Sequence, residues 1–274
     1  MFDLEKLKGK RVAIVGGAGF IGHNLAFKLK ELGAAPYVID GLQVNNIGYY
    51  TSDYDQNLNA ERYIAFINER LSMLRKAHIS LKIIDVRDYH AISSAISDIN
   101  PDVVVHLAAI AHANRSNQDP YSTFDHSMRT LENVLDVTRS QGIHVIYFSS
   151  SMVYGNFDGE AVTEDRVCNP MGIYGALKYG AEKLVIGYNQ VFDLPYTIIR
   201  PSALYGERCV SRRVGQAFIE NAIIKRINVV LLMNTCGSIR DMKIGTVNGV
   251  IKIIYAENSR LMMKYIDRYK IYMI

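Results

Sequence analysis

The sequence has few cysteines and no long apolar run. Its three cysteines, Cys168, Cys209 and Cys236, form no Cys-x-x-Cys pair, so neither a disulfide framework nor a zinc site is expected. No stretch approaches the roughly 20 consecutive apolar residues of a membrane span. The first residues, 1–6, carry charges where a signal peptide would need an apolar core, so we do not expect export. These absences favour a cytoplasmic protein in a reducing compartment.

A strong overall charge is also missing, but the charge is unevenly spread. The net charge is +4, and residues 207–274 hold 12 Lys/Arg against 5 Asp/Glu, a net +7 that leaves −3 for residues 1–206. The basic end fits a diphosphate ligand, an RNA or a solvated face. No aromatic pattern is interleaved with these charges, so the sequence does not predict a nucleic-acid partner.

Short apolar runs alternate with amphipathic segments over the first 200 residues. The expected strands are residues 11–15, 36–40, 81–84, 102–106, 144–148 and 196–199. This alternation predicts an α/β fold with a doubly wound parallel sheet of the Rossmann type. Beyond Gly206 the pattern weakens to one helix near residues 211–224 and one strand at 229–232. We therefore expect one domain over residues 1–206 and a short C-terminal lobe over 207–274.

A glycine-rich loop joins the first expected strand to the first expected helix. Gly16, Gly19 and Gly22 have the spacing G-x-x-G-x-x-G, a variant of the dinucleotide fingerprint. Glycines there allow a tight turn and close approach of a pyrophosphate, and the free N–H groups at the helix start favour anions. The sequence predicts a dinucleotide held by these glycines together with Phe20 and Ile21.

The second expected strand ends at an acidic residue. Asp40 lies 18 residues after Gly22, where a carboxylate binds the adenosine ribose hydroxyls. It would repel a 2′-phosphate, and no arginine directly follows to accept one, so the cofactor is expected to be NAD. The alternative is an aspartate that initiates the turn at Gly41.

Two further strand ends carry candidate residues. The residues at the third strand end fit either a contact to adenine or a helix cap, and the small residues after the fourth strand would let the cofactor lie against the backbone. This group is Asp85, Val86, Leu107, Ala108 and Ala109. His112 fits either an acid–base or ligand role or an ordinary polar loop position.

The expected helix after residue 172 carries a tyrosine and a lysine four residues apart. This spacing places Tyr174 and Lys178 on one helix face. A phenol has a pKa near 10, and a neighbouring ammonium lowers it. With the serines at residues 149–151 after the fifth strand, the pair predicts proton transfer at a sugar or alcohol hydroxyl while a nicotinamide takes the hydride.

These motifs resemble those of the extended short-chain dehydrogenases/reductases, in the NAD-dependent epimerase/dehydratase group that acts on nucleotide sugars and includes UDP-glucose 4-epimerase. They occur in family order over about residues 10–210. The matching residues are Gly16, Gly19, Gly22, Asp40, Asp85–Val86, His106–Ala109, Ser149–Gly155, Tyr174, Lys178 and Arg200–Gly206.

The resemblance implies a role for each matching residue. Tyr174 would remove the sugar hydroxyl proton, Lys178 would bind the nicotinamide ribose and tune the tyrosine, and Ser150 would hydrogen-bond the reacting oxygen. Substrate contacts would come from Ser116, Ser151 and Arg200. The implied partners are a nucleotide-diphosphate sugar and a second copy of the chain, packed through helices near residues 121–140 and 173–191.

Departures from the family pattern narrow the reaction. The family's 4,6-dehydratases carry an Asp-Glu pair directly after the catalytic residue, and its decarboxylases carry a Glu at the second position. Here these positions are Ser151 and Met152, which do no acid–base work near neutral pH. This favours a 4-epimerase with a transient 4-keto intermediate, serving polysaccharide or lipopolysaccharide sugar synthesis. A nucleotide-sugar reductase or dehydrogenase and a non-catalytic NAD-binding protein are the alternatives.

Other departures concern substrate binding. Ala203 and Ser127 replace asparagines that are usual in the family, and the segment that begins at Arg240–Asp241 lacks the two aspartates that follow in relatives. The chain also stops before a typical substrate domain would finish. We therefore expect a truncated C-terminal lobe.

Overall fold

The computed structural model describes residues 4–44, 47–52, 59–111, 113–157, 162–202, 204–210, 216, 220, 245–247 and 250–252. The chain forms two compact units. The first consists of Met1–Gly155 and Cys168–Ser202, and the second of Asn156–Val167 and Ala203–Ile274. The expected boundary at residue 206 stays a prediction. All residues discussed below belong to the first unit unless stated.

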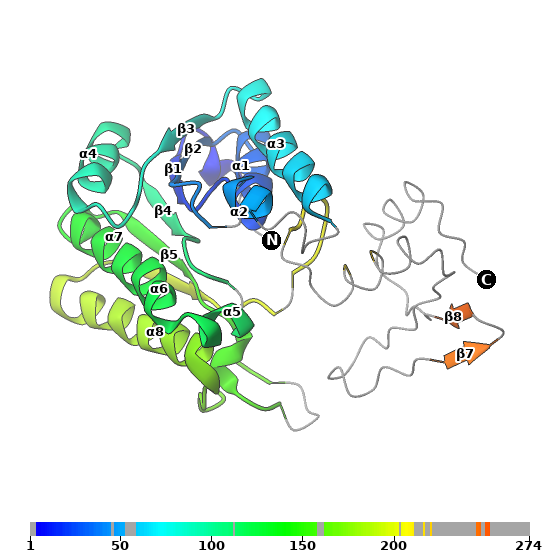
Figure 1. Ribbon diagram of the computed structural model, residues 1–274. Helices are drawn as coiled ribbons and strands as arrows, with labels where there is room; N and C mark the ends of the chain where they lie inside the picture. Colours follow the sequence, from blue (N-terminus) through cyan, green and yellow to red (C-terminus); the bar gives the residue numbers. More distant parts are fainter. Residues whose placement is uncertain are drawn as a thin grey trace. The chain divides into compact units, whose positions relative to one another are not determined.

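A six-stranded parallel sheet forms the centre of the first unit (Figure 1). Its order is β3-β2-β1-β4-β5-β6, and each neighbouring pair is parallel. The strands in this order are Ser80–Ile83, Ala35–Asp40, Arg11–Val15, Val103–His106, His144–Phe148 and Tyr196–Ile199. The predicted doubly wound sheet is confirmed. In the second unit, β7 (Gly245–Val247) and β8 (Val250–Lys252) pair antiparallel.

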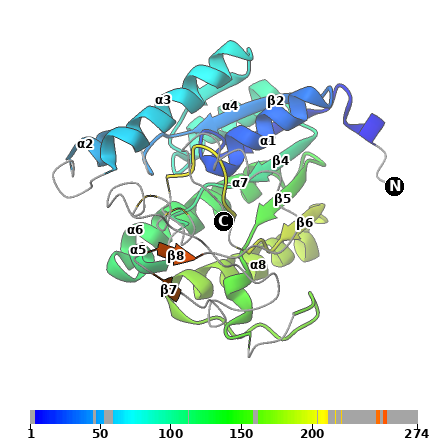
Figure 2. The same ribbon diagram turned by 90° about the vertical axis from the view of Figure 1, so that its right-hand side faces the viewer.

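Helices cover both faces of the sheet, as Figures 1 and 2 show. One face packs against α4 (Tyr89–Ile99), α7 (Thr130–Thr138) and α8 (Gly172–Phe192). The other packs against α1 (Phe20–Glu31) and α3 (Ala60–Lys76). Because the central strands are buried on both faces, they read as continuous apolar runs, and Val12 to Val15 are almost inaccessible to solvent.

The long helix expected over residues 121–140 contains a π-helical turn that the sequence did not predict. It contains α6 (Pro120–Phe124), a π-helical turn (η2, Asp125–Arg129) and then α7. The side chain of Asp119 caps α6 by accepting a hydrogen bond from the N–H of Ser122 at 3.0 Å. A π-turn inserts one residue into the helix, which rotates the face that α7 presents to the sheet.

Four short helical elements were not predicted. They are η1 (Leu4–Leu7), α2 (Ile47–Ser52), α5 (Ala113–Gln118) and η3 (Ser151–Tyr154). The second of these, α2, lies in a polar stretch of the sequence without apolar periodicity. Its Tyr50 is buried and meets the ring of Tyr63 on α3 edge-on, at 5.2 Å between centroids. A tertiary contact, not local periodicity, therefore stabilises this helix.

Candidate active site

The glycine loop between β1 and α1 has the geometry that its sequence predicts. Gly16 has φ +79°, and a Cβ there would lie 2.7 Å from the backbone nitrogen of Ala108. A Cβ on Gly22 would lie 2.6 Å from the carbonyl oxygen of Gly17. Gly19 is the N-cap of α1, and no side chain caps that helix. The first N–H groups of α1, in the turn that includes Phe20 and Ile21, therefore have no capping side chain and follow a loop whose one side chain is the methyl group of Ala18, which suits a phosphate.

Asp40 ends β2 and is bonded to this loop. Its Oδ2 accepts a hydrogen bond from the N–H of Ala18 at 2.9 Å, and its Oδ1 accepts one from the N–H of Leu42 at 2.8 Å. Burial raises the pKa of Asp40, and the two amides and Arg70 oppose that rise. The turn-forming role is thus present, and each carboxylate oxygen keeps a further lone pair. The contact to an adenosine ribose stays a prediction.

Asp85 follows β3 and does not cap a helix. Asp88 caps α4 instead, accepting hydrogen bonds from the N–H groups of His90 and Ala91 at 3.0 and 3.1 Å. The carboxylate of Asp85 accepts from Arg87 at 2.7 Å, a contact that holds the pKa of Asp85 well below its usual value. The helix-cap alternative is therefore wrong, and a contact to adenine stays a prediction.

Val86 and the residues after β4 surround the loop. Val86 is buried in the core beside α4. The N–H of Leu107 donates to the carbonyl of Val15 at 2.8 Å, which holds the end of β4 beside the end of β1. Ala108 follows, with its backbone close to Gly16, and Ala109 is next in the chain. In doubly wound sheets this edge, where the strand order reverses between β1 and β4, is the binding position for nucleotides.

The lysine of the Tyr/Lys pair is buried against the end of β5. Lys178 is 6% exposed, and its Nζ donates a hydrogen bond to the carbonyl of Phe148 at 2.6 Å. Burial lowers the pKa of Lys178 to about 8, and the charge of Glu182 opposes that change. Tyr174 lies one turn earlier on α8 and is half-buried. The pair shares one helix face, as predicted.

The three serines after β5 have different environments. The hydroxyl of Ser149 donates to the carboxylate of Glu182, and both are buried. Ser150 begins the 3₁₀ turn η3, and its Oγ accepts a hydrogen bond from the N–H of Met152 at 3.2 Å. The N–H of Ser151 donates to the carbonyl of Pro201 at 2.9 Å. Of the three, Ser149 has a structural contact that spacing did not predict.

Two predicted substrate residues have a place within the protein itself: one is paired and the other is buried. Arg200 forms a two-pronged ion pair with Glu182, Nε to Oε1 at 3.0 Å and Nη2 to Oε2 at 2.8 Å. Its Nη1 donates to the hydroxyl of Tyr154 at 2.9 Å. Ser116 on α5 is fully buried, and the side chain of its neighbour Asn117 accepts from the N–H of Ile173 at 3.4 Å. The substrate contacts of Ser116, Ser151 and Arg200 stay predictions.

Sequence reasoning missed two buried groups beside the Tyr/Lys pair. Glu182 is the first, and its position four residues after Lys178 is a signal that could have found it. His106, the last residue of β4, is 1% exposed, and neither ring nitrogen makes a hydrogen bond of normal geometry to the described residues. Burial and then the charge of Lys178 lower the pKa of His106 to about 3.

Some candidates lie outside the described residues: His112, Ala203, Arg240 and Asp241, and the expected strand 229–232. Of the expected helix 211–224, residues 216 and 220 are described, and both are helical. In the described part of the chain, no helix is long and apolar enough to cross a membrane. The same residues contain no group of three or more His, Cys, Asp or Glu side chains able to hold a metal ion.

The model of the NAD dependent epimerase/dehydratase family matches residues 12–242. The chain belongs to this family. Its cofactor is NAD, and the site fits that molecule, because no side chain caps the start of α1 at Gly19 and the first N–H groups of the helix suit a pyrophosphate. Gly16, Gly19, Gly22 and Asp40 are the residues that would hold it.

Two of the similar proteins are named for different reactions. Protein CapI of Staphylococcus aureus is 31% identical over 198 residues, 72% of this chain and 54% of that protein. UDP-glucuronate 4-epimerase 3 of Arabidopsis thaliana is 27% identical, and the match covers 74% of this chain and 44% of that protein. dTDP-D-glucose 4,6-dehydratase of Dictyostelium discoideum is 27% identical, and the match covers 86% of this chain and 51% of that protein. The chain thus spans about half the length of the curated relatives it matches.

A solved structure agrees with the fold. UDP-glucuronic acid 4-epimerase from Bacillus cereus, crystallised with UDP-glucuronic acid and NAD, superposes with a TM-score of 0.66. The two chains are 23% identical, and the match covers 82% of this chain and 67% of that one. The Rossmann-type architecture of the first unit is therefore shared with an enzyme that binds NAD.

Proposed function

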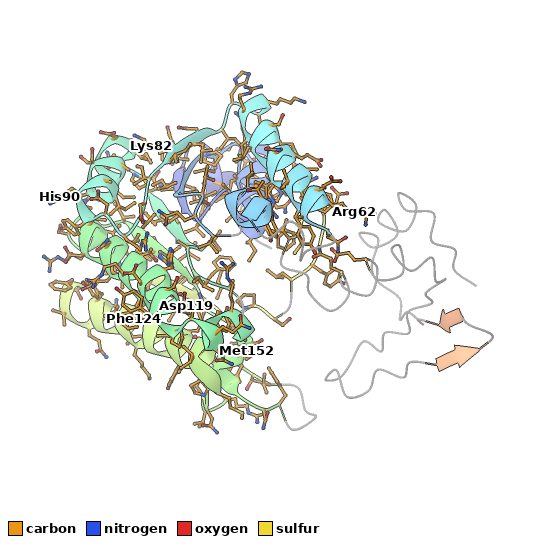
Figure 3. All side chains as sticks on the ribbon, viewed as in Figure 1. Arg62, Lys82, His90, Asp119, Phe124 and Met152 are labelled. Atoms are coloured by element: carbon orange, nitrogen blue, oxygen red, sulfur yellow. The ribbon has the colours of Figure 1, made fainter. Side chains whose placement is uncertain are left out.

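We propose that the protein is an NAD-dependent epimerase that inverts C4 of a nucleotide-diphosphate sugar through a transient 4-keto intermediate. The observation that carries this choice is the identity of residues 151 and 152. Elimination of water needs a proton donor and acceptor directly after Ser150, and the chain has Ser151 and Met152 there. Met152 is 39% exposed on the turn that follows β5 (Figure 3). Epimerisation needs one base only.

In the proposed reaction Tyr174 accepts the proton of the C4 hydroxyl as the hydride leaves C4. NAD supplies the hydride acceptor and donor. The ammonium of Lys178, fixed on the carbonyl of Phe148, favours the phenolate form of Tyr174 by its charge. Ser150 donates its hydroxyl proton to the sugar oxygen, because the hydrogen bond from Met152 occupies only a lone pair of Oγ. Once the keto sugar has turned over, Tyr174 would return the proton to the C4 oxygen as NAD, in its reduced form, would supply the hydride for the opposite face.

The test is substitution of the base. Tyr174→Phe is expected to lower the epimerisation rate about 10²–10⁴-fold, the usual contribution of a general base, and to leave NAD binding intact. A panel of UDP-, dTDP-, GDP- and CDP-sugars followed by NMR identifies the substrate. An inverted C4 without net NADH formation supports the proposal. An unchanged rate in the variant, or a 4-keto-6-deoxy product as a dehydratase would form, contradicts it.

Other parts of the proposal depend on the same family likeness. Ser116, Ser151 and Arg200 contact the sugar, and residues 207–274 are a short substrate-binding lobe. We also propose a cytoplasmic location, a role in polysaccharide synthesis, and a homodimer that packs through the region of α6, α7 and α8. Sedimentation of the purified protein tests the dimer.

A further inference from the structure

A buried carboxylate lies at the junction of three elements beside the Tyr/Lys pair. Glu182 on α8 is 1% exposed. It accepts two hydrogen bonds from Arg200, directly after β6, and one from Ser149, directly after β5. Two parallel N–H···O contacts fix both the position and the plane of a carboxylate. Glu182 therefore ties α8 to the ends of two neighbouring strands.

The same residue shares a helix face with the proposed catalytic groups. Tyr174, Lys178 and Glu182 are spaced by four residues along α8, so their side chains follow one another on one stripe. A shift of α8 along its axis would move all three together. The contacts of Glu182 to the strand ends thus fix the position of α8 along its axis, and with it the positions of Tyr174 and Lys178 relative to the edge of the sheet.

Among the charged and titratable groups described around Lys178, Glu182 is the one that supplies negative charge. Tyr147 of β5 presents its ring, 4.9 Å from Nζ, and His106 of β4 is neutral. Arg200 is cationic, but its guanidinium is directed to Glu182. Among the described neighbours, the charge of Glu182 is the influence that raises the pKa of Lys178 against the effect of burial.

We propose that Glu182 is a positioning residue of this site: it holds α8, and with it Tyr174 and Lys178, at the strand ends, and it supplies the negative charge on their face of the helix. The expected effect of Glu182 on turnover rests on the proposed function. The expected effect of Glu182 on Lys178 is independent of which sugar is the substrate.

The experiment compares Glu182→Gln with Asp136→Asn in the full chain. Asp136 on α7 is also paired, with Arg139 at 3.2 Å, and its substitution removes the same charge near the far end of α8, where it faces Tyr188. The titration of Lys178 is followed by NMR of protein labelled at lysine Cε, with Lys178→Met to assign the resonance. We expect Glu182→Gln to lower the midpoint by on the order of one pH unit and Asp136→Asn to leave it unchanged.

A second readout is turnover. With a midpoint near 8, about half of Lys178 is charged at pH 8, and a shift of about one unit leaves about a tenth. The kcat of Glu182→Gln at pH 8 should fall about fivefold and recover toward pH 6.5, while KM stays near the wild-type value. A role in folding alone would lower kcat equally at both pH values, and that outcome contradicts the proposal.

Glu182→Gln leaves the half-buried guanidinium of Arg200 without its anion, and the variant can fail to fold. Glu182→Gln with Arg200→Met removes both charges and is then measured in its place, with the same direction of shift expected. If the Lys178 midpoint in the folded variant equals that of the wild type, the proposal is wrong, whatever sugar the enzyme takes. If the midpoint shifts but no nucleotide sugar reacts, the proposed function fails and the inference about Lys178 stands.

Discussion

Acid should destabilise this protein through His106. The imidazole is 1% exposed, and its pKa is lowered to about 3, first by burial and then by the charge of Lys178. In the unfolded chain a histidine has a pKa of about 6.5. Between these two values the unfolded state binds a proton that the folded state refuses. His106 therefore does not lower the free energy of unfolding above about pH 6.5, and it lowers that free energy progressively as the pH drops below this value.

The size of the loss follows from that interval. Each pH unit below the unfolded pKa costs about 1.4 kcal/mol, so the 1.5 units from 6.5 to pH 5 cost about 2 kcal/mol at most. We expect His106→Leu to lose this part of the pH dependence. It should also be no less stable than wild type at pH 7, because it removes a buried polar group whose ring nitrogens lack a normal hydrogen bond to the described residues.

The assay is urea unfolding at pH 7 and pH 5. Carboxylates also titrate in this range, so the informative quantity is the difference between wild type and variant, about 2 kcal/mol, or roughly 1 M in the urea midpoint. His90→Leu is the matched control, because His90 lies exposed on α4 (Figure 3) and should keep the wild-type slope. If His106→Leu and wild type lose equal stability between the two pH values, the reasoning is refuted.

The parts of the fold that local chemistry determines were predictable. Buried parallel strands such as Arg11–Val15 require continuous apolar runs, and the loop from Gly16 to Gly22 requires glycine because a Cβ would meet backbone atoms. Both requirements act on single residues. They are visible in the sequence before any tertiary contact is known.

The features that the sequence did not reveal depend on contacts between distant residues. Ser149 contacts Glu182, which lies 33 residues away in the chain, and the spacing of the serines gives no sign of that contact. Arg200 matched a family motif, but its spacing of 18 residues from Glu182 gives no sign of the ion pair. The helix near Tyr50 lies in a polar stretch without periodicity, so its packing on α3 was invisible.

Backbone space and buried charge give two further predictions. Gly22→Ala would place a Cβ 2.6 Å from the carbonyl of Gly17, so we expect a loss of about 1–3 kcal/mol in urea unfolding and weaker NAD binding by calorimetry. The control Gly180→Ala lies in α8 with open space and should gain about 0.5–1 kcal/mol; equal effects at both sites would contradict the packing argument. Arg200→Met leaves the carboxylate of Glu182 buried and unpaired by its cation, a cost of about 3–5 kcal/mol. The double variant with Glu182→Gln has no uncompensated buried carboxylate, so it should regain most of the stability that Arg200→Met loses. A loss in the double variant equal to the sum of the two single losses would show that the residues do not act as a pair.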